Sequence, residues 1–193
     1  MPSPSKAAQH LGQSPDHRMV LFVGRLDPVK GLDTLVRAMA LVVRDEPSLR
    51  GRSCLCIVGG QKPDTPDRLE AEHDRIDRLA REVGLGDVVH FMGSVPQDDL
   101  PYYYSAAQVV VVPSRYESFG MVALEAMACG APVIASDVGG LSTLVRDGRT
   151  GYLVPDGDPP ALADRLLPLL RDAALRSELG RHGIATAEAY SWP

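Results

Sequence analysis

The sequence has few of the features that mark specialised classes of protein. It contains three cysteines and one tryptophan, and its formal net charge is -5. No apolar run approaches the ~20 residues that a membrane-spanning helix needs, and the N-terminus lacks the basic and then apolar order of a secretory signal. The negative balance provides no field to attract nucleic acid or an anionic membrane. We therefore expect a protein that neither spans a membrane nor binds nucleic acid.

The cysteines are too few and too scattered for a disulfide framework. Cys54 and Cys56 lie in an apolar strand pattern, and Cys129 lies in an apolar helix pattern. An odd number of cysteines in apolar surroundings indicates reduced core thiols, so we expect a reducing compartment, the cytoplasm. No second Cys or His pair has the spacing of zinc ligands, so we expect no metal site.

The length of 193 residues fits one domain with a short tail. Residues 1–17 are rich in Ser, Pro, Gln and Ala and have no periodicity, which predicts a disordered linker or tail. We expect residues 18–193 to form the domain.

Short apolar segments recur along this domain, and each ends at glycine, proline or a polar residue. They are residues 19–23, 54–58, 88–92, 109–112, 132–135 and 151–154. Apolar strands without alternation are typical of a parallel sheet that is buried on both faces. Segments of helical periodicity lie between them. The alternation predicts an α/β fold with a doubly wound, Rossmann-like parallel sheet of six strands.

Glycines and polar residues gather where these strands would end. Such positions include Gly24, Gly93 and the ranges 59–60, 114–120 and 137–140. Ligands of doubly wound sheets bind outside the carboxyl ends of the strands. The pattern therefore predicts that one edge of the sheet binds a ligand.

The segment from about residue 119 to 129 has the pattern of a helix that is apolar on every side except at Glu125. Such a helix is expected to be buried, and a buried carboxylate needs partners that donate hydrogen bonds. One interpretation is a buried salt bridge to Arg or Lys. The other is a carboxylate that accepts hydrogen bonds from two sugar hydroxyls, such as those of a ribose.

The start of that helix has the features of an anion site. The N–H groups of Phe119, Gly120 and Met121 would be free, and glycine lets a ligand approach the backbone. Glu117 would point a carboxylate into the same cleft or serve as a partner of the helix dipole. Arg25 and Lys30 would flank an anion there. The alternative is that both are solvated loop charges. Together these residues predict a nucleotide diphosphate site.

Two segments that contain these residues, 24–31 (GRLDPVKG) and 113–125 (PSRYESFGMVALE), resemble the signature segments of retaining glycosyltransferases with the GT-B fold. The resemblance continues through 125–135, 138–140 and 147–151 and covers about residues 19–192. It is to family 4, also called group 1, and is greatest for the branch of sucrose synthases, sucrose-phosphate synthases and mycothiol glycosyltransferases. The chain resembles the C-terminal half of these proteins, which binds the nucleotide sugar.

The resemblance implies a role for each matching residue. Arg25 and Lys30 would hold the donor diphosphate, Glu117 would act near the reacting carbon of the sugar, and Glu125 would hold the ribose. Val95 would meet the base. Further contacts with the sugar donor would come from Gly24, Ser118, Phe119, Gly120, Met121 and Leu124.

The resemblance also implies how the reaction proceeds. The family retains the anomeric configuration and requires no metal, because Arg and Lys stabilise the leaving diphosphate, so we expect no cofactor besides a nucleotide-sugar substrate. Similarity to the branch favours UDP over GDP or ADP. The family has an N-terminal, acceptor-binding domain that nothing before residue 19 matches. We therefore expect this chain to be inactive alone, with any membrane contact made through that domain.

Other functions remain open beside this one. A dinucleotide-binding dehydrogenase domain would show G-x-G-x-x-G after its first strand, and the sequence has none. A non-catalytic nucleotide-sugar-binding module, a phosphorylase and an epimerase fit the same motifs. The sequence departs from the family after Gly140, where Leu141 and Ser142 stand in place of a frequent Pro-Glu pair.

Overall fold

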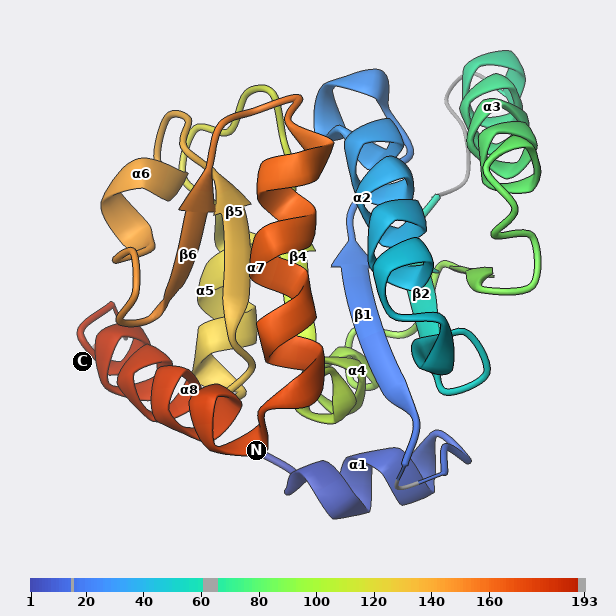
Figure 1. Ribbon diagram of the computed structural model, residues 1–193. Helices are drawn as coiled ribbons and strands as arrows, with labels where there is room; N and C mark the ends of the chain where they lie inside the picture. The colour runs from blue at the N-terminus through green and yellow to red at the C-terminus, as the bar shows by residue number, and fades with distance from the viewer. Residues whose placement is uncertain (15, 61–65, 191–193) are drawn as a thin grey trace.

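Six parallel strands form the centre of the fold in the computed structural model, which describes residues 1–14, 16–60 and 66–190, with the backbone alone at 66–70 (Figure 1). They are β1 (Arg18–Val23), β2 (Ser53–Val58), β3 (Val89–Gly93), β4 (Val109–Val112), β5 (Val133–Ser136) and β6 (Gly151–Val154). Their order across the sheet is β3-β2-β1-β4-β5-β6, and every neighbouring pair is parallel. The predicted doubly wound sheet is confirmed, and each strand lies within one residue of its expected bounds.

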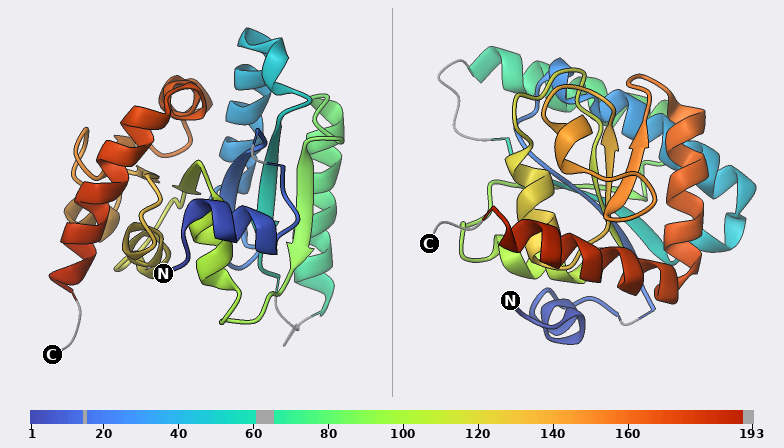
Figure 2. Two further views of the ribbon diagram at one scale, coloured as in Figure 1. Left: turned by 90° about the horizontal axis from the view of Figure 1, so that it is seen from below. Right: turned by 90° about the vertical axis from the view of Figure 1, so that its left-hand side faces the viewer.

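Helices cover both faces of this sheet (Figures 1 and 2). One face carries α2 (Leu32–Asp45), α3 (Pro66–Glu82) and α7 (Pro159–Arg171), and the other carries α4 (Leu100–Ala106), α5 (Met121–Ala128) and the short α6 (Leu141–Leu144). Helix α8 (Ala173–Glu188) packs against α5 and α7. Two single-turn 3-10 helices, η1 (Pro28–Lys30) and η2 (Pro47–Leu49), flank α2.

Each central strand contributes side chains to two separate hydrophobic cores. In β1, Val20 and Phe22 enter the core beneath α2, α3 and α7, whereas Met19 and Leu21 enter the core on the other face. All four side chains are at most 2% exposed. Burial on both faces explains why the strands are apolar without alternation.

The N-terminal segment differs from the expected tail. Residues Pro4–His10 form α1, which packs against α4 below the sheet (Figure 2). Ser3 caps the helix by accepting from the N–H of Lys6, Ala7 is fully buried, and the ring of His10 stacks on Tyr102 with centroids 3.9 Å apart. The sequence did contain the signal of a helix start, because a capping serine is followed by a proline at the first helical position. With Ala7 as its one buried residue, the helix has no hydrophobic periodicity from which its full length could be predicted.

The chain reverses its direction of travel across the sheet after β3. Strands β1, β2 and β3 proceed to one edge, β4 returns to the other side of β1, and β5 and β6 continue outward. The carboxyl ends of β1 and β4 are therefore neighbours, and the helices that follow them, α2 and α5, cover opposite faces of the sheet, which creates the crevice where doubly wound sheets bind ligands. These two loops contain residues 24–31 and 113–120.

Candidate functional site

The loops after β1 and β4 are in direct contact at this crevice. The N–H of Arg115 donates to the carbonyl oxygen of Val29 at 2.8 Å. Gly31 precedes α2 with φ at 67°, and a Cβ there would lie 2.0 Å from the carbonyl oxygen of Pro113. Only glycine accommodates both the positive φ and the close approach. Gly31 thus lets the two loops close on one another.

The contact between the loops brings two predicted site residues together. The Nζ of Lys30 lies 2.8 Å from Oε2 of Glu117, and the side chains are only 22% and 19% exposed. Lys30 is the last residue of η1, whose cap Asp27 accepts from the N–H of Val29. The sequence predicted that both residues belong to the site, but it did not predict that they contact each other.

The Glu117 carboxylate also faces the backbone at the start of α5. Partial burial alone would raise its pKa. The hydrogen bond and charge of Lys30, with the N–H groups of Phe119 and Gly120, outweigh burial and hold the pKa below its usual value of 4.5. These two N–H groups were predicted to be free, but here both lower the pKa of the Glu117 carboxyl, as expected of a carboxylate beside a helix N-terminus.

Two glycines after β5 fix the backbone that carries Glu117. The N–H of Gly140 donates to the carbonyl oxygen of Glu117 at 3.0 Å, and a Cβ at Gly139, where φ is 49°, would lie 2.0 Å from the same oxygen. The neighbouring Leu141 is fully buried and packs under Gly120. The departure from the family pattern at Leu141 therefore supplies an apolar support for the start of α5.

Glu125 has a partner that was not predicted from the sequence. The hydroxyl of Tyr104 in α4 donates to its Oε2 at 2.7 Å, and no Lys, Arg or His in the described part of the chain lies within 4.0 Å of the carboxylate. The buried salt bridge is therefore wrong for these residues. Tyr104 is 2% exposed, and a buried tyrosine usually needs a hydrogen-bond partner. The need of a buried tyrosine for an acceptor is the one feature that could have pointed to this contact.

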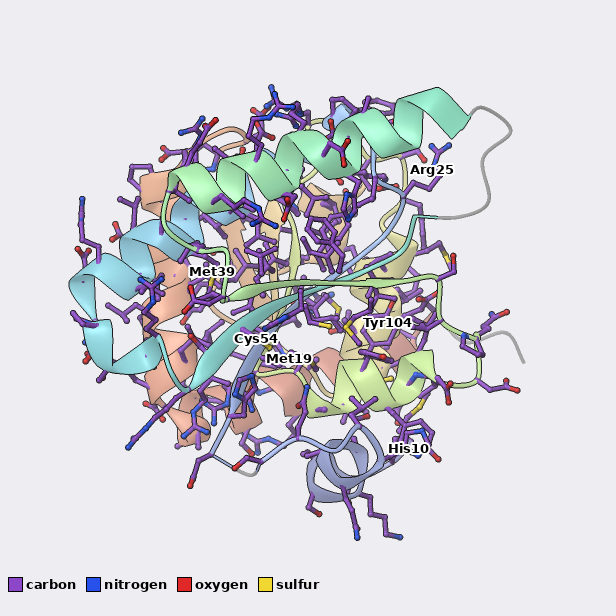
Figure 3. All side chains as sticks on the ribbon, turned by 90° about the vertical axis from the view of Figure 1, so that its right-hand side faces the viewer. His10, Met19, Arg25, Met39, Cys54 and Tyr104 are labelled. Atoms are coloured by element: carbon purple, nitrogen blue, oxygen red, sulfur yellow. The ribbon has the colours of Figure 1, made fainter. Side chains whose placement is uncertain are left out.

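Arg25 and Val95 border a shallow pocket beyond the carboxyl ends of β1, β2 and β3. Its volume is about 230 Å³, below the roughly 300–1,000 Å³ of complete small-molecule sites, so it can hold part of a ligand. Arg25 is exposed at the edge of the molecule (Figure 3) and makes no hydrogen bond or ion pair with another described residue. The pocket is lined by Val23, Gly24, Arg25, Val58, Gly59, Gly60, Ser94, Val95 and Leu100.

The remaining predicted residues form the rim of the crevice. Ser118, Phe119 and Met121 are exposed, and Leu124 is half-buried. Met121, the first residue of α5, is 56% exposed, and Phe119, which precedes the helix, is 42% exposed. The expectation of a wholly buried helix from about residue 119 is therefore wrong at its start. Phe119 contacts the ring of Tyr190 edge-on, with centroids 6.0 Å apart.

The described residues also limit what else the chain could bind. No group of three His, Cys, Asp or Glu side chains in those ranges could hold a metal ion. None of the described helices has the length and hydropathy to cross a bilayer. A larger cavity of about 570 Å³ lies among α1, α4, α5 and α8, at the opposite end of the strands. None of the predicted site residues lines it, so the crevice at the carboxyl ends is the candidate site.

Comparisons with known proteins agree with this geometry. Curated D-inositol 3-phosphate glycosyltransferases from Frankia alni and Acidothermus cellulolyticus are 43% and 45% identical to 98% and 97% of this chain. The matched parts are 46% and 41% of those proteins, so the chain spans less than half of their length.

Solved structures show the same fold. A sucrose-phosphate synthase from Thermosynechococcus elongatus matches 96% of this chain and 44% of its own with a TM-score of 0.86 and 45% identity. HepE of Anabaena, in complex with UDP and glucose, matches 96% of this chain and 47% of its own with a TM-score of 0.82 and 28% identity. The family model described as Glycosyl transferases group 1 matches residues 5–186. The chain therefore belongs to the Glycosyl transferases group 1 family.

Proposed function

We propose that this chain binds the UDP-sugar donor of a retaining glycosyltransferase. The observation that carries the proposal is the contact between Lys30 and Glu117 where the loops after β1 and β4 meet. Arg25 and Glu125 belong to the same two signature segments. The complexes of HepE with UDP and with UDP-glucose support UDP as the nucleotide.

In this proposal, the cations and the carboxylates at the crevice bind different parts of the donor. Arg25 and Lys30 stabilise the negative charge that develops on the leaving diphosphate. Glu117 accepts from hydroxyls of the transferred sugar, and Glu125 accepts from the ribose. Because the two cations supply positive charge at the leaving group, the proposed transfer needs no metal.

Smaller contacts complete the proposed site. The backbone at Phe119, Gly120 and Met121 meets the sugar and the phosphates, and the pocket beside Val95 accommodates the base. In the transfer, the bond between the sugar carbon and the phosphate oxygen breaks while the acceptor oxygen bonds to the same face. The acceptor proton passes to the leaving phosphate.

The acceptor side of the reaction belongs to another part of the enzyme in this proposal. Positioning of reactants can account for about 7–11 kcal/mol of a barrier, and the crevice described here offers one wall only. Any contact with a membrane is assigned to that other part. The free thiols Cys54, Cys56 and Cys129 support a reducing compartment such as the cytoplasm.

Calorimetry with UDP, GDP, ADP and NAD tests the proposal directly. We expect UDP to bind most tightly and NAD to bind least. Incubation with a UDP-sugar that the chain binds should release UDP no faster than the uncatalysed rate. If no nucleoside diphosphate binds, the proposed function is wrong. Rapid release of UDP that is abolished in Glu117→Ala would show that the chain carries a complete catalytic site.

A further inference from the structure

The hydrogen bond from Tyr104 connects the candidate site to the interior of the domain. Tyr104 comes from α4 and Glu125 comes from α5, and the hydroxyl-to-Oε2 distance is 2.7 Å. Tyr104 lies in the interior on that face of the sheet (Figure 3). The same core contains Ala126 and Met127, both fully buried. The partner of Glu125 is therefore held rigidly, whereas a glutamate side chain on its own has three rotatable bonds to order.

The chemistry of this partner distinguishes it from a salt bridge. Burial, and then the hydrogen bond to Glu125, raise the pKa of the Tyr104 hydroxyl far above its usual value, so it remains a neutral donor of one hydrogen bond. A neutral donor orients a carboxylate without cancelling its charge. Tyr104 uses Oε2, and within the described ranges Oε1 accepts no hydrogen bond. The carboxylate keeps acceptor capacity for a ligand.

We propose that Tyr104 is a positioning residue for Glu125. It holds the carboxylate in the orientation that accepts from the two hydroxyls of a ribose, so that less conformational freedom is lost when the nucleotide binds. This inference rests on the proposed function, because it assigns the ribose to Glu125. It adds that the nucleotide affinity depends on a side chain that does not touch the nucleotide.

The test compares two ligands in four variants by calorimetry. The ligands are UDP and 2′,3′-dideoxyuridine diphosphate, which lacks both ribose hydroxyls. Tyr104→Phe keeps the ring and removes only the donor. Tyr103→Phe is the matched control, because Tyr103 lies in the same helix, is 9% exposed and makes no hydrogen bond through its hydroxyl with another described residue. Glu125→Gln and the double variant with Tyr104→Phe complete the set.

We expect Tyr104→Phe to weaken UDP binding by about fivefold to tenfold. This is less than the full contribution of a hydrogen bond to a charged group, because the lost bond affects UDP only through the orientation of Glu125. The affinity for the dideoxy ligand should not change, and Tyr103→Phe should bind both ligands like the wild type. In the Glu125→Gln background, Tyr104→Phe should cause no further loss. Circular dichroism and thermal unfolding verify that each variant is folded.

The other possible results separate a failure of this inference from a failure of the proposed function. Equal losses for both ligands in Tyr104→Phe would overturn the inference, because the hydroxyl would then act through general packing. Wild-type affinity for UDP in Tyr104→Phe, with weaker binding in Glu125→Gln, would also overturn it and leave the proposed function intact. If the wild type binds UDP no better than the dideoxy ligand, the assignment of the ribose to Glu125 fails and the inference fails with it. If the wild type does not bind UDP, the proposed function itself fails.

Discussion

The ion pair between Lys30 and Glu117 leads to an unusual prediction, that removal of an acidic site residue strengthens binding. Glu117 engages the ammonium of Lys30 and the N–H groups of Phe119 and Gly120. A diphosphate would require the same kinds of donors and would be repelled by the carboxylate. The Glu117→Gln variant keeps the shape of the side chain and removes the charge. We therefore expect it to bind UDP more tightly.

The magnitude follows from the burial of the pair. Exposed ion pairs contribute about 0.2–1 kcal/mol, and a hydrogen bond to a charged group contributes about 1.5–3 kcal/mol. The Lys30 and Glu117 side chains are 22% and 19% exposed, so their pair belongs between these ranges, near 1 kcal/mol. Release of that competition should tighten UDP binding by about fivefold. The gain for a UDP-sugar should be smaller, because the sugar hydroxyls lose a charged acceptor.

Calorimetric titration of UDP, a UDP-sugar and uridine measures this effect. Uridine lacks the diphosphate, so its affinity should be the same in Glu117→Gln and in the wild type. Glu82→Gln, which removes one exposed negative charge at the end of α3, controls for the change in net charge. If Glu117→Gln binds UDP no more tightly than Glu82→Gln does, the idea that Glu117 competes with the diphosphate is refuted.

Three further predictions concern the same crevice. Arg25→Ala should weaken UDP binding by roughly 1.5–3 kcal/mol, and Lys30→Ala should weaken it less, because Lys30 is already paired; calorimetry that finds equal losses would contradict this order. Gly139→Ala should lower the free energy of unfolding by about 2 kcal/mol more than Gly148→Ala does, because an added Cβ at Gly139 would lie 2.0 Å from the carbonyl oxygen of Glu117, whereas one at Gly148 would meet nothing within 4 Å. Equal melting temperatures of the two variants would count against the close approach. Because folding lowers the pKa of Glu117, its stabilisation is present above pH 4.5 and is lost as the pH falls through the lowered value; unfolding curves of the wild type and Glu117→Gln should converge in that acidic range, and a constant difference would argue against the assignment.

The strands, and the glycines at their carboxyl ends, could be predicted because their signals are local. A strand buried on both faces must be apolar along its whole length, as β4 is from Val109 to Val112. A strand that ends at a ligand edge is followed by residues such as Gly24 that allow close backbone approach.

The contacts within the site depend on distant parts of the chain. Lys30 and Glu117 are 87 positions apart, and Tyr104 and Glu125 are 21 positions apart. Which side chains meet is decided by the crossing of the loops and by the packing of α4 on α5, and neither leaves a periodic pattern. Helix α1 was missed for a similar reason, because its burial depends on α4. The roles of Arg25, Val95 and the rim residues toward a sugar donor stay predictions.

The reversal of direction after β3 also has a consequence for how the site forms during folding. The amide of Met19 at the start of β1 donates to the side chain of Gln108, a residue 89 positions away. Pairing over such a separation requires a large loop to close and is intrinsically slow. During synthesis on the ribosome, β1, β2 and β3 emerge before β4. The edge of β1 that pairs with β4 therefore stays unpaired until β4 has been made. The crevice is therefore a seam between an early and a late half of the chain, and the contact between Lys30 and Glu117 can form only when both halves are present.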